Sequence, residues 1–305
     1  MVKKAILGQL DDVDIRRLRV FRVVTEAGGI SAAELELNIG RSTISTHIKD
    51  LEIRLGVTLC RRGRSGFSLT EEGSYIYKAT LRLLASLDEF RAEVSELNQH
   101  LSGQLNIALF DKIATNPEAH IDRAFKHFDA IAPDVKMTIY VESLNEIEQG
   151  VMEGRFQVGV IPSHRVSPSL SYQPIFNEHM KLYCGKEHQL FGLSDSVITK
   201  QDILNCKYAG LGYHSPNMEI GRKLGMQREV TVYDQEAIVH LLLSGCYLGY
   251  LPDHYADNLV EQGLIRAIGT KVFFYECEFL VINRSSPKPS RIVQTFLDCL
   301  TQAHI

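Results

Sequence analysis

Residues 41–56, RSTISTHIKDLEIRLG, combine an apolar face and an opposite polar face in one short stretch of chain. Apolar side chains recur at helical spacing and would pack inward: Ile44, Ile48, Leu51 and Leu55. The other face carries small hydroxyls and a cation: Ser42, Ser45, Thr46 and Lys49. It lacks the dense Glu/Lys pairing of an ordinary solvated helix. Short hydroxyls beside a cation suit close approach to a groove lined with phosphates, so this pattern indicates a helix that contacts nucleic acid.

The preceding segment supplies the partner helices that such a stretch needs. Residues 14–27 repeat apolar side chains every three residues and stop at a Gly-Gly pair. Ser31 and Glu34 have the Ser-x-x-Glu spacing of a capping box, which predicts the start of a short second helix. Asn38 and Gly40 tolerate left-handed backbone angles and predict a tight turn. Two short helices joined by a tight turn indicate a helix-turn-helix.

The stretch RRGRSGFSLT that follows is a Gly-punctuated basic loop leading into a short strand. Arg61, Arg62 and Arg64 could contact phosphates or the minor groove, as the wing of a winged helix-turn-helix does. Residues 1–70 carry twelve Lys or Arg against eight Asp or Glu, whereas the whole chain has a net charge of −4. A basic segment on an acidic body is typical of a polyanion-binding module. An amphipathic surface helix followed by a basic loop is the alternative interpretation.

The chain resembles the LysR-type transcriptional regulators through LRVFRVVTEAGGISAAELELNIGRSTISTHIKDLEIRLGVTLCRRGRSGFSLTEEG and the order of its later elements. The resemblance implies a winged helix-turn-helix in residues 1–70, a dimerising linker helix in 71–102 and an effector-binding domain in 103–305. It also implies a DNA-facing set: Arg41, Ser42, Thr43, Ser45, Thr46, Lys49, Arg61, Arg62 and Arg64. Gly40-Arg41-Ser42 stands where the family more often has Ser-Gln-Pro, and Cys60 where Phe is usual. Operator preference therefore does not transfer from relatives.

Residues 70–99 predict one long helix, because they contain no proline and only one early glycine, Gly73. Its apolar stripe recurs every three or four residues: Tyr77, Leu81, Leu84, Leu87, Phe90, Val94, Leu97 and Leu101. A stripe this long exceeds what one small domain covers, so we expect it to pair with a second copy. Packing within the same chain is the alternative. A dimer matches a palindromic operator on double-stranded DNA, and the resemblance alone implies a further homotetramer.

The remaining chain alternates strands and helices, which predicts an α/β fold with parallel strands. Buried strands are expected at QLNIAL, VKMTIYV and FQVGVI, with a helix starting near Thr115-Asn116-Pro117 and a capping box at Ser143 and Glu146. The pattern repeats after residue 172, with a helix at about 235–244 and a final helix from about 290. Crossovers near residues 162–169 and 266–270 would divide lobe I (about 103–165 and 268–305) from lobe II (about 166–267). This resembles the periplasmic-binding-protein architecture that the family uses.

Ligands in such folds bind at the carboxyl ends of strands, in the cleft between lobes. That rule selects an effector-binding set: Phe110, Asp111, Lys112, Thr115, Ser143, Leu144, Tyr213, His214, Ser215, Asp234 and Gln235. Helix starts at Asn116, Ser143 and Asp234 would offer N–H groups to an anion. Lys112 could also pair with an anion, whereas Asp111 favours a cationic or polar ligand. Ordinary caps and surface polar groups are the alternative roles for all of these residues.

The leading hypothesis is a ligand-responsive transcription factor, and two other classes compete with it. No GxSxG, HExxH, P-loop or GxGxxG motif supports an enzyme. A nucleoid-type architectural protein would bind DNA with little sequence preference and ignore metabolites. We expect no cofactor and no metal, because the cysteines show no ligand spacing: Cys60, Cys184, Cys206, Cys246, Cys277 and Cys299. Buried free thiols are the expected role, and a redox pair among Cys184, Cys206 and Cys246 is the alternative.

Composition completes the sequence-based expectations. The hydrophobic fraction of 45% and the charged fraction of 23% are ordinary for a globular protein. No apolar run reaches the roughly 20 residues of a membrane span, and the N-terminus lacks a signal-peptide core. The sequence therefore predicts a cytoplasmic protein with no membrane partner.

Overall fold

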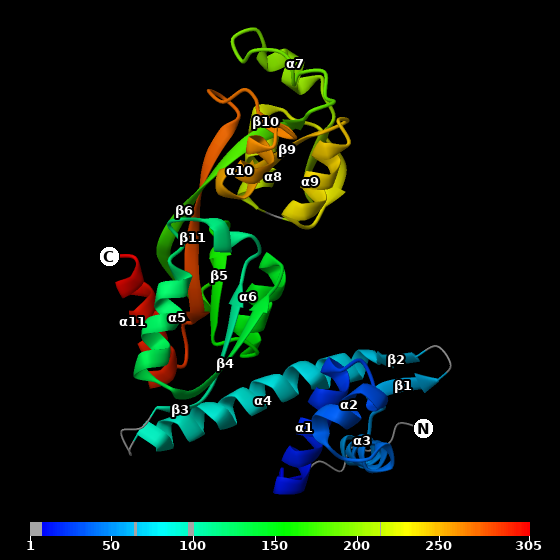
Figure 1. Cartoon of the computed structure of the whole chain (residues 1–305). Helices are drawn as coiled ribbons and strands as arrows, with labels where there is room; N and C mark the ends of the chain where they lie inside the picture. Colours follow the sequence, from blue (N-terminus) through cyan, green and yellow to red (C-terminus); the bar gives the residue numbers. More distant parts are fainter. Residues whose placement is uncertain (1–7, 64–65, 97–100, 214) are drawn as a thin grey trace. The chain divides into compact units, whose positions relative to one another are not determined.

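The computed structural model describes residues 8–63, 66–96, 101–213 and 215–305. The chain forms two compact units, one of residues 1–91 and one formed mainly by residues 92–305 (Figure 1). Within the described ranges, no helix is both long enough and apolar enough to cross a membrane.

The first unit is a helix-turn-helix followed by a two-stranded hairpin and a long helix. Its elements are α1 (Asp12–Glu26), α2 (Ile30–Leu37), α3 (Arg41–Leu55), β1 (Cys60–Gly63), β2 (Gly66–Leu69) and α4 (Glu71–Glu96). The core between the first three helices includes Phe21, Val24, Ile44 and Ile48, all fully buried. Each such side chain contributes about 2 kcal/mol on burial. The inward face of residues 41–56 is therefore the face that holds α3 in place.

The start of α2 differs from the expected capping box. The helix begins at Ile30 after Gly29, which has a φ of +148°, and no side chain caps it. Glu34 binds Arg41 instead, with Oε2 2.7 Å from Nε. A capping box forms at the start of α1. The Asp11 side chain accepts the N–H of Asp14, and the Asp14 side chain accepts the N–H of Asp11. The glycine pair sets the entry to α2 by its backbone angles, so the helix needs no hydroxyl cap.

Two ion pairs attach α3 to α1. Asp14 is 1% exposed, and its carboxylate lies 3.2 Å from the Arg54 guanidinium. Arg17 binds Asp50 at 2.9 Å. Glu52 Oε1 accepts the N–H of Leu59 at 2.8 Å and so joins the end of α3 to the hairpin. These bonds fix the orientation of α3 relative to the hairpin that follows it.

The second unit is built on one mixed sheet. Its strands are β3 (Ser102–Leu109), β4 (Asp134–Val141), β5 (Val158–Pro162), β6 (Leu170–Gly185), β7 (Tyr208–Leu211), β8 (Arg228–Val232), β9 (Leu248–Pro252), β10 (Ile265–Ala267) and β11 (Phe274–Arg284). The strand order is β4-β3-β5-β11-β6-β9-β7-β8, and β10 pairs with β6. β3, β4 and β5 are parallel to one another, as are β7, β8 and β9. β6 and β11 are antiparallel and join these two sets.

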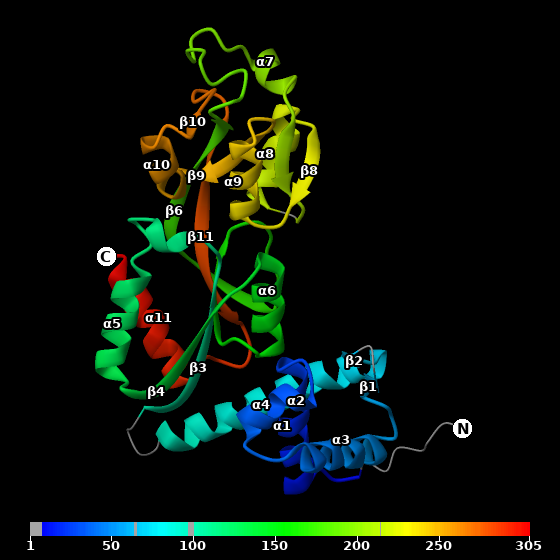
Figure 2. The same cartoon turned by 45° about the vertical axis from the view of Figure 1, so that its right-hand side comes forward.

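Helices cover both sets of parallel strands. They are the 3₁₀ turn η1 (Ile113–Thr115), α5 (Ile121–Ile131), α6 (Leu144–Glu153), α7 (Lys200–Leu204), α8 (Pro216–Leu224), α9 (Gln235–Leu243), α10 (Asp253–Glu261) and α11 (Arg291–Ala303). α5 and α11 lie side by side, with the rings of Phe125 and Phe296 5.7 Å apart (Figure 2). We call β3–β5 with α5, α6 and α11 lobe I, and β7–β10 with α7–α10 lobe II.

The passages between the lobes lie inside β6 and β11, which corrects the expected crossovers near residues 162–169 and 266–270. β6 pairs with β11 from Leu170 opposite Arg284 to Lys181 opposite Phe274. From Met180 onward β6 also pairs with β9 of lobe II, and from Tyr183 it pairs with β10. At about 3.3 Å per residue, a strand of this length extends through both lobes. The connection is therefore a shared strand pair.

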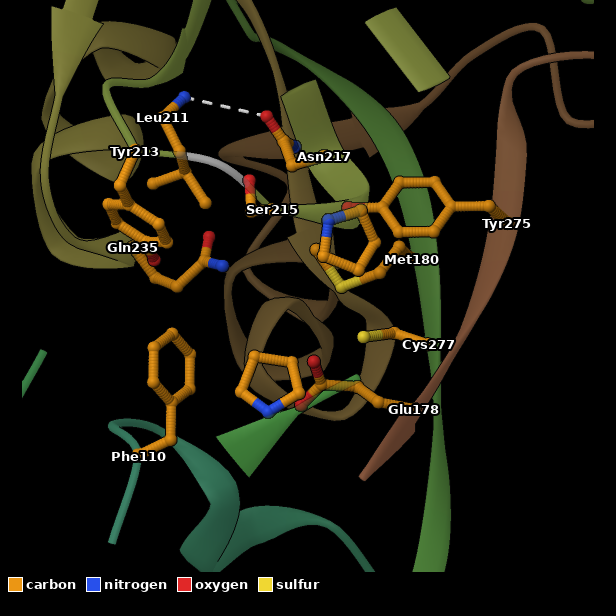
Figure 3. Close-up of a pocket in the computed structure, with 12 residues that line it drawn as sticks. Phe110, Glu178, Met180, Leu211, Tyr213, Ser215, Asn217, Gln235, Tyr275 and Cys277 are labelled. Carbon is orange, nitrogen blue, oxygen red and sulfur yellow. Dashed lines mark hydrogen bonds between the residues drawn. The ribbon is translucent and has the colours of Figure 1, made fainter. Parts of the chain in front are cut away.

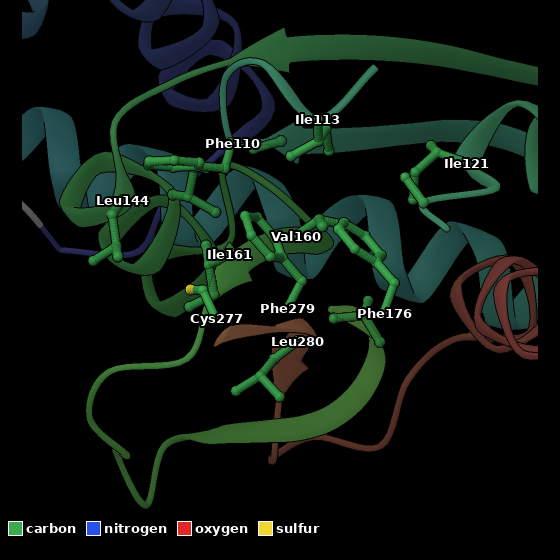
Figure 4. Close-up of a cluster of buried hydrophobic side chains, with 14 of the residues drawn as sticks. Phe110, Ile113, Ile121, Leu144, Val160, Ile161, Phe176, Cys277, Phe279 and Leu280 are labelled. Carbon is green, nitrogen blue, oxygen red and sulfur yellow. The ribbon is translucent and has the colours of Figure 1, made fainter. Parts of the chain in front are cut away.

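One apolar core runs through both lobes, and Figure 4 shows the part of it around Phe176 and Phe279. The Phe176 and Phe279 rings stack 4.7 Å apart, and Phe110 lies 6.1 Å from Phe279. Leu144 is fully buried in the same cluster. This apolar cluster positions the end of β3 and the middle of β6 at the boundary between the lobes.

The expected helix start at Thr115-Asn116-Pro117 is wrong. Residues 113–115 form the 3₁₀ turn, and α5 begins only at Ile121. Asn116 uses its side chain locally, because Oδ1 accepts the N–H of Glu118 at 2.9 Å and Nδ2 donates to Asn177 O at 3.0 Å. The loop is thereby attached to β6. The expected helices at about 235–244 and from about 290 are confirmed as α9 and α11.

Candidate functional site

The exposed face of α3 presents polar side chains to solvent. Ser42, Thr43, Thr46 and Lys49 are exposed, and Ser45 is half-buried. Thr46 Oγ1 donates to the carbonyl of Ser42 at 3.0 Å, which leaves its lone pairs free to accept. A row of hydroxyls and one ammonium on a rigid, well-anchored helix can enter a groove and bond to backbone phosphates and base edges.

Arg41 stands at the start of this face and already has an acidic partner. Its guanidinium binds Glu34 on α2, and 64% of the Arg41 side chain is exposed. An exposed pair of this kind contributes no more than about 1 kcal/mol, so a phosphate can replace the carboxylate. Arg41 therefore has the reach and the exposure of a phosphate ligand.

The hairpin of β1 and β2 carries the predicted wing. Arg61 is exposed and lies opposite Ser68, while the Arg62 backbone lies opposite Phe67. The side chain of Arg62 and the whole of Arg64 lie outside the described residues. Cys60 is 5% exposed and packs into the first unit's core. The hairpin is thus attached to the core at its base and presents Arg61 to solvent.

A pocket lies between lobe I and lobe II (Figure 3). Its lining comes from β5, β6, β7, β11, the start of α8, the start of α9 and the loop after β3. The lining residues are Phe110, Pro162, Glu178, Met180, Leu211, Tyr213, Ser215, Pro216, Asn217, Gln235, Tyr275 and Cys277. A mostly apolar lining with a few polar groups is typical of a small-molecule site.

Only part of the sequence-predicted effector set lines this pocket. Phe110, Tyr213, Ser215 and Gln235 do. Ser143 and Asp234 are exposed caps of α6 and α9, and Leu144 belongs to the core of lobe I. His214 lies outside the described residues. Asp111, Lys112 and Thr115 lie in the loop after β3 and contact lobe II beside the pocket.

Three contacts join that loop to lobe II. The backbone N–H of Gln235 lies close to the Asp111 carboxylate and lowers its pKa, against the rise that burial causes. Lys112 Nζ lies 3.3 Å from Glu236 Oε2. Thr115 Oγ1 lies 2.8 Å from His254 Nδ1. All three cross from lobe I to the first turn of a lobe II helix, so they depend on how closely the lobes approach.

Glu178 is the pocket residue that sequence reasoning missed. It is 5% exposed, faces the cavity from β6 and lies opposite Cys277 on β11. Its Oε1 is 3.0 Å from His254 Nε2. His254 therefore contacts Thr115 through one ring nitrogen and the pocket residue Glu178 through the other. Burial raises the pKa of Glu178, and His254 opposes that shift. The signal in the sequence was a glutamate among the buried alternate positions Phe176, Met180 and Leu182.

Two buried amide groups in the lining each have one polar atom without a partner among the described residues. Asn217 is 2% exposed; its Oδ1 accepts from the Tyr208 hydroxyl at 2.9 Å and from Leu211 N–H at 3.4 Å. Its Nδ2 has no hydrogen-bond partner within the described residues, and the same holds for Oε1 of Gln235. Buried polar groups are normally satisfied, so these atoms point to a ligand that completes their bonding.

The cysteines do not form a redox pair in this structure. None of the six forms a disulfide, and Cys60, Cys184, Cys277 and Cys299 are buried. Burial raises the pKa of Cys184 to about 11, which suppresses the reactive thiolate at neutral pH. Cys246 is exposed, contrary to the expectation of buried thiols. Within the described ranges, no three His, Cys, Asp or Glu side chains gather as metal ligands.

Comparison with known proteins matches both units. Residues 15–74 match the family model "Bacterial regulatory helix-turn-helix protein, lysR family", and residues 98–304 match "LysR substrate binding domain". The chain is 39% identical over 294 residues to the HTH-type transcriptional activator BauR of Pseudomonas aeruginosa, covering 96% of each chain.

Solved structures share the fold at lower identity. Full-length CbnR complexed with its target DNA aligns with a TM-score of 0.63 at 20% identity, covering 95% of this chain and 99% of that chain. A full-length OxyR variant from Pseudomonas aeruginosa aligns with a TM-score of 0.63 at 17% identity, covering 96% of this chain and 95% of that chain. With two family models spanning almost the whole sequence and a relative matched along nearly its full length, the chain belongs to the LysR family of DNA-binding transcriptional regulators, which are not enzymes.

Proposed function

We propose that this regulator binds a specific operator through α3 and the β1–β2 hairpin and responds to a small molecule held between its lobes. The observation that carries the proposal is the exposed hydroxyl and ammonium face of α3, supported beneath by a buried core and by the Asp14–Arg54 pair. A surface face of this kind, anchored from behind, is what direct reading of a major groove requires.

We assign the contacts with DNA by position. Ser42, Thr43, Ser45 and Thr46 would meet base edges and backbone oxygens, and Lys49 a phosphate. Arg41 would exchange Glu34 for a phosphate on binding. The wing arginines Arg61, Arg62 and Arg64 would contact the backbone or minor groove beside the site.

The functional form in this proposal is a dimer that pairs through α4. Phe90 is 63% exposed and Val94 is 46% exposed, one helical turn apart. Large apolar side chains at this spacing on a long helix favour packing on a second α4. Two-fold symmetry would then match a palindromic operator, and two dimers would form the tetramer implied by the family resemblance.

Ligand control would act through the contacts between the lobes. A molecule in the pocket would touch Phe110 of lobe I and Tyr213, Ser215 and Gln235 of lobe II, which line it. It therefore favours whichever lobe separation completes its contacts. The contacts of the loop after β3 with lobe II would strengthen or weaken with that separation. Regulation follows only if the ligand binds the two lobe arrangements with different affinity.

A footprint of the full-length protein on the DNA upstream of its own gene, at physiological salt, tests the proposal. We expect a protected, approximately palindromic site whose protection is lost on the double substitution Thr46→Ala and Lys49→Ala. Salt-sensitive binding without a preferred site would favour the architectural alternative. No binding at all would refute the role of α3.

A further inference from the structure

The charges around the inter-lobe pocket restrict the ligand that it accepts. Among the described residues that line the cavity, Glu178 carries the only formal charge, and none is Lys, Arg or His. Lys112, the cation in the loop after β3, is held by Glu236. A ligand whose only charged groups are anionic would lack a counter-charge and would face a buried carboxylate. The pocket therefore favours a ligand with a positive group.

Glu178 is placed to receive that positive group. His254 contacts Oε1, and the carboxylate is directed into the cavity from β6 (Figure 3). Burial and the neighbouring Asp111 and Asp253 carboxylates raise the pKa of Glu178, so an added cation relieves an existing electrostatic cost. Gln235 adds a second buried acceptor, Oε1, that has no partner in the described part of the chain.

At the start of α8 the pocket instead favours a hydrogen-bond acceptor or a negative group on the ligand. Leu211 N–H can only donate, so the amide oxygen of Asn217 must face it and Nδ2 is left as a donor without a partner among the described residues. Asn217 and Ser215 both line the cavity at the N-terminus of this nine-residue helix. Pro216 has no N–H and the N–H of Met218 is bonded to Ser215 Oγ, so Asn217 supplies the first-turn donors at this end, where the helix dipole favours negative charge. A hydrogen-bond acceptor on the ligand, best a carboxylate, would bond to Nδ2 of Asn217 and would also lie favourably at the N-terminus of α8.

We propose that the pocket binds a small zwitterion of the amino-acid class, with its ammonium group on Glu178 and its carboxylate at the start of α8 beside Asn217. This inference rests on the proposed function, because it names the class of effector for the same site. A simple amine would leave Nδ2 of Asn217 unpaired, and a simple carboxylate would add a second negative group to the pocket and leave Glu178 with His254 as before.

Isothermal titration calorimetry of the full-length protein tests the class directly. The probes are the standard amino acids and a series of linear ω-amino acids, which varies the separation of the two charges. Each is compared with the amine and the carboxylate of the same carbon skeleton. We expect at least one amino acid to bind about tenfold or more tightly than its matched amine, with weaker binding still for the matched carboxylate. A carboxylate that binds more tightly than every amino acid, or no binding by any amino acid, would overturn the proposal.

Two isosteric variants separate the two ends of the ligand. Glu178→Gln should reduce amino-acid affinity by about tenfold or more, because it removes the counter-charge and keeps the shape. Asn217→Asp keeps the acceptor for Tyr208 and Leu211 but replaces the donor by a carboxylate oxygen. This variant should bind the amino acid more weakly than the wild type does, and should bind the matched amine equally well or more tightly. Equal loss of both probes in Asn217→Asp would contradict the assigned orientation.

The controls distinguish this inference from the proposed function. Glu261→Gln, an exposed change on α10, should leave every affinity unchanged. Each variant is footprinted without ligand, and its melting temperature is measured. Specific DNA binding without amino-acid binding would refute the ligand class and leave the regulator intact. Amino-acid binding without a specific DNA site would refute the proposed operator role and leave the pocket assignment standing.

Discussion

Lys49 and Thr46 are neighbours on the exposed face of α3 and differ in what they offer to DNA. Lys49 brings a full charge, which displaces a condensed counterion when it meets a phosphate. Thr46 is neutral, and its hydroxyl is oriented by the bond to Ser42 O. The first group affects binding to any DNA sequence, and the second affects recognition of a particular one.

Replacing these residues one at a time should separate the two effects. Lys49→Ala should weaken binding to all sequences and reduce the slope of log affinity against log salt by about 1. Thr46→Ala should reduce specific affinity with the slope unchanged. Fluorescence anisotropy on operator and random duplexes over a salt series measures both. Lys271→Ala, an exposed lysine of the second unit, is the matched control. An unchanged slope in Lys49→Ala would remove that residue from the DNA-facing set.

Among the secondary-structure elements, the start of α4 packs very closely against the hairpin. A Cβ atom at Gly73 would lie 1.8 Å from the Leu59 carbonyl oxygen, which precedes β1. Thr70 Oγ1 accepts Gly73 N–H at 2.8 Å and donates to Thr58 O at 2.6 Å. The helix and the hairpin therefore share one backbone contact that has no room for a side chain.

Gly73→Ala should destabilise the first unit by about 1–3 kcal/mol, because backbone must move to admit the methyl group. Urea unfolding followed by circular dichroism, together with DNA affinity, measures the change. Gly192→Ala, where no heavy atom lies within 4 Å of the added Cβ, is the control and should be close to neutral. A Gly73→Ala protein as stable as the wild type would show that α4 and the hairpin can separate at no cost.

The exposed apolar side chains near the end of α4 lead to a second prediction at this scale. Phe90→Asp should shift the oligomer towards monomer, since it places a charge in the proposed contact between two α4 helices. Sedimentation velocity over a concentration series measures the shift. Phe90→Leu keeps an apolar group and should retain the dimer. A Phe90→Asp protein that sediments as a dimer would require another dimer contact.

Across the second unit as a whole, Glu178 couples stability to pH through groups from several elements. His254 of α10, Asp111 after β3 and Asp253 all act on its carboxylate, and burial raises its pKa above the ordinary value of 4.5. The folded protein thus holds this proton more tightly than the unfolded chain does. The resulting stabilisation is complete below pH 4.5 and is lost as the pH rises through the raised pKa.

Comparing Glu178→Gln with the wild type isolates this contribution. The glutamine variant should gain in melting temperature relative to the wild type as the pH rises from below 4.5 through the raised pKa, and the difference should then level off. Differential scanning calorimetry without ligand measures it. If the wild type gained relative to the variant over that range, the contact with His254 would outweigh burial, and the direction assigned to the pKa would be wrong.

Periodicity was enough to predict the elements but not the details of their ends. The buried residues Ile44, Ile48 and Leu51 lie where the helical spacing placed them. Ser31 did not become a cap, because Gly29 already supplies the turn before α2. Asn116 did not begin a helix, because its side chain bonds to the backbone of β6 far along the chain. Local sequence patterns do not reveal such interactions, because the bonding partner comes from a distant segment of the chain.

The sequence by itself determined the helix-turn-helix, its polar face, the long helix and the alternation of strands and helices, because each depends on spacing within a short window. Only the tertiary structure decided which residues meet in the pocket. Glu178, Asn217 and Cys277 lie on three elements that are distant in sequence, and the pairing of β6 with β11 and the position of α8 bring them together. Register between distant strands and the burial of a charge are set by long-range packing, which local spacing does not encode.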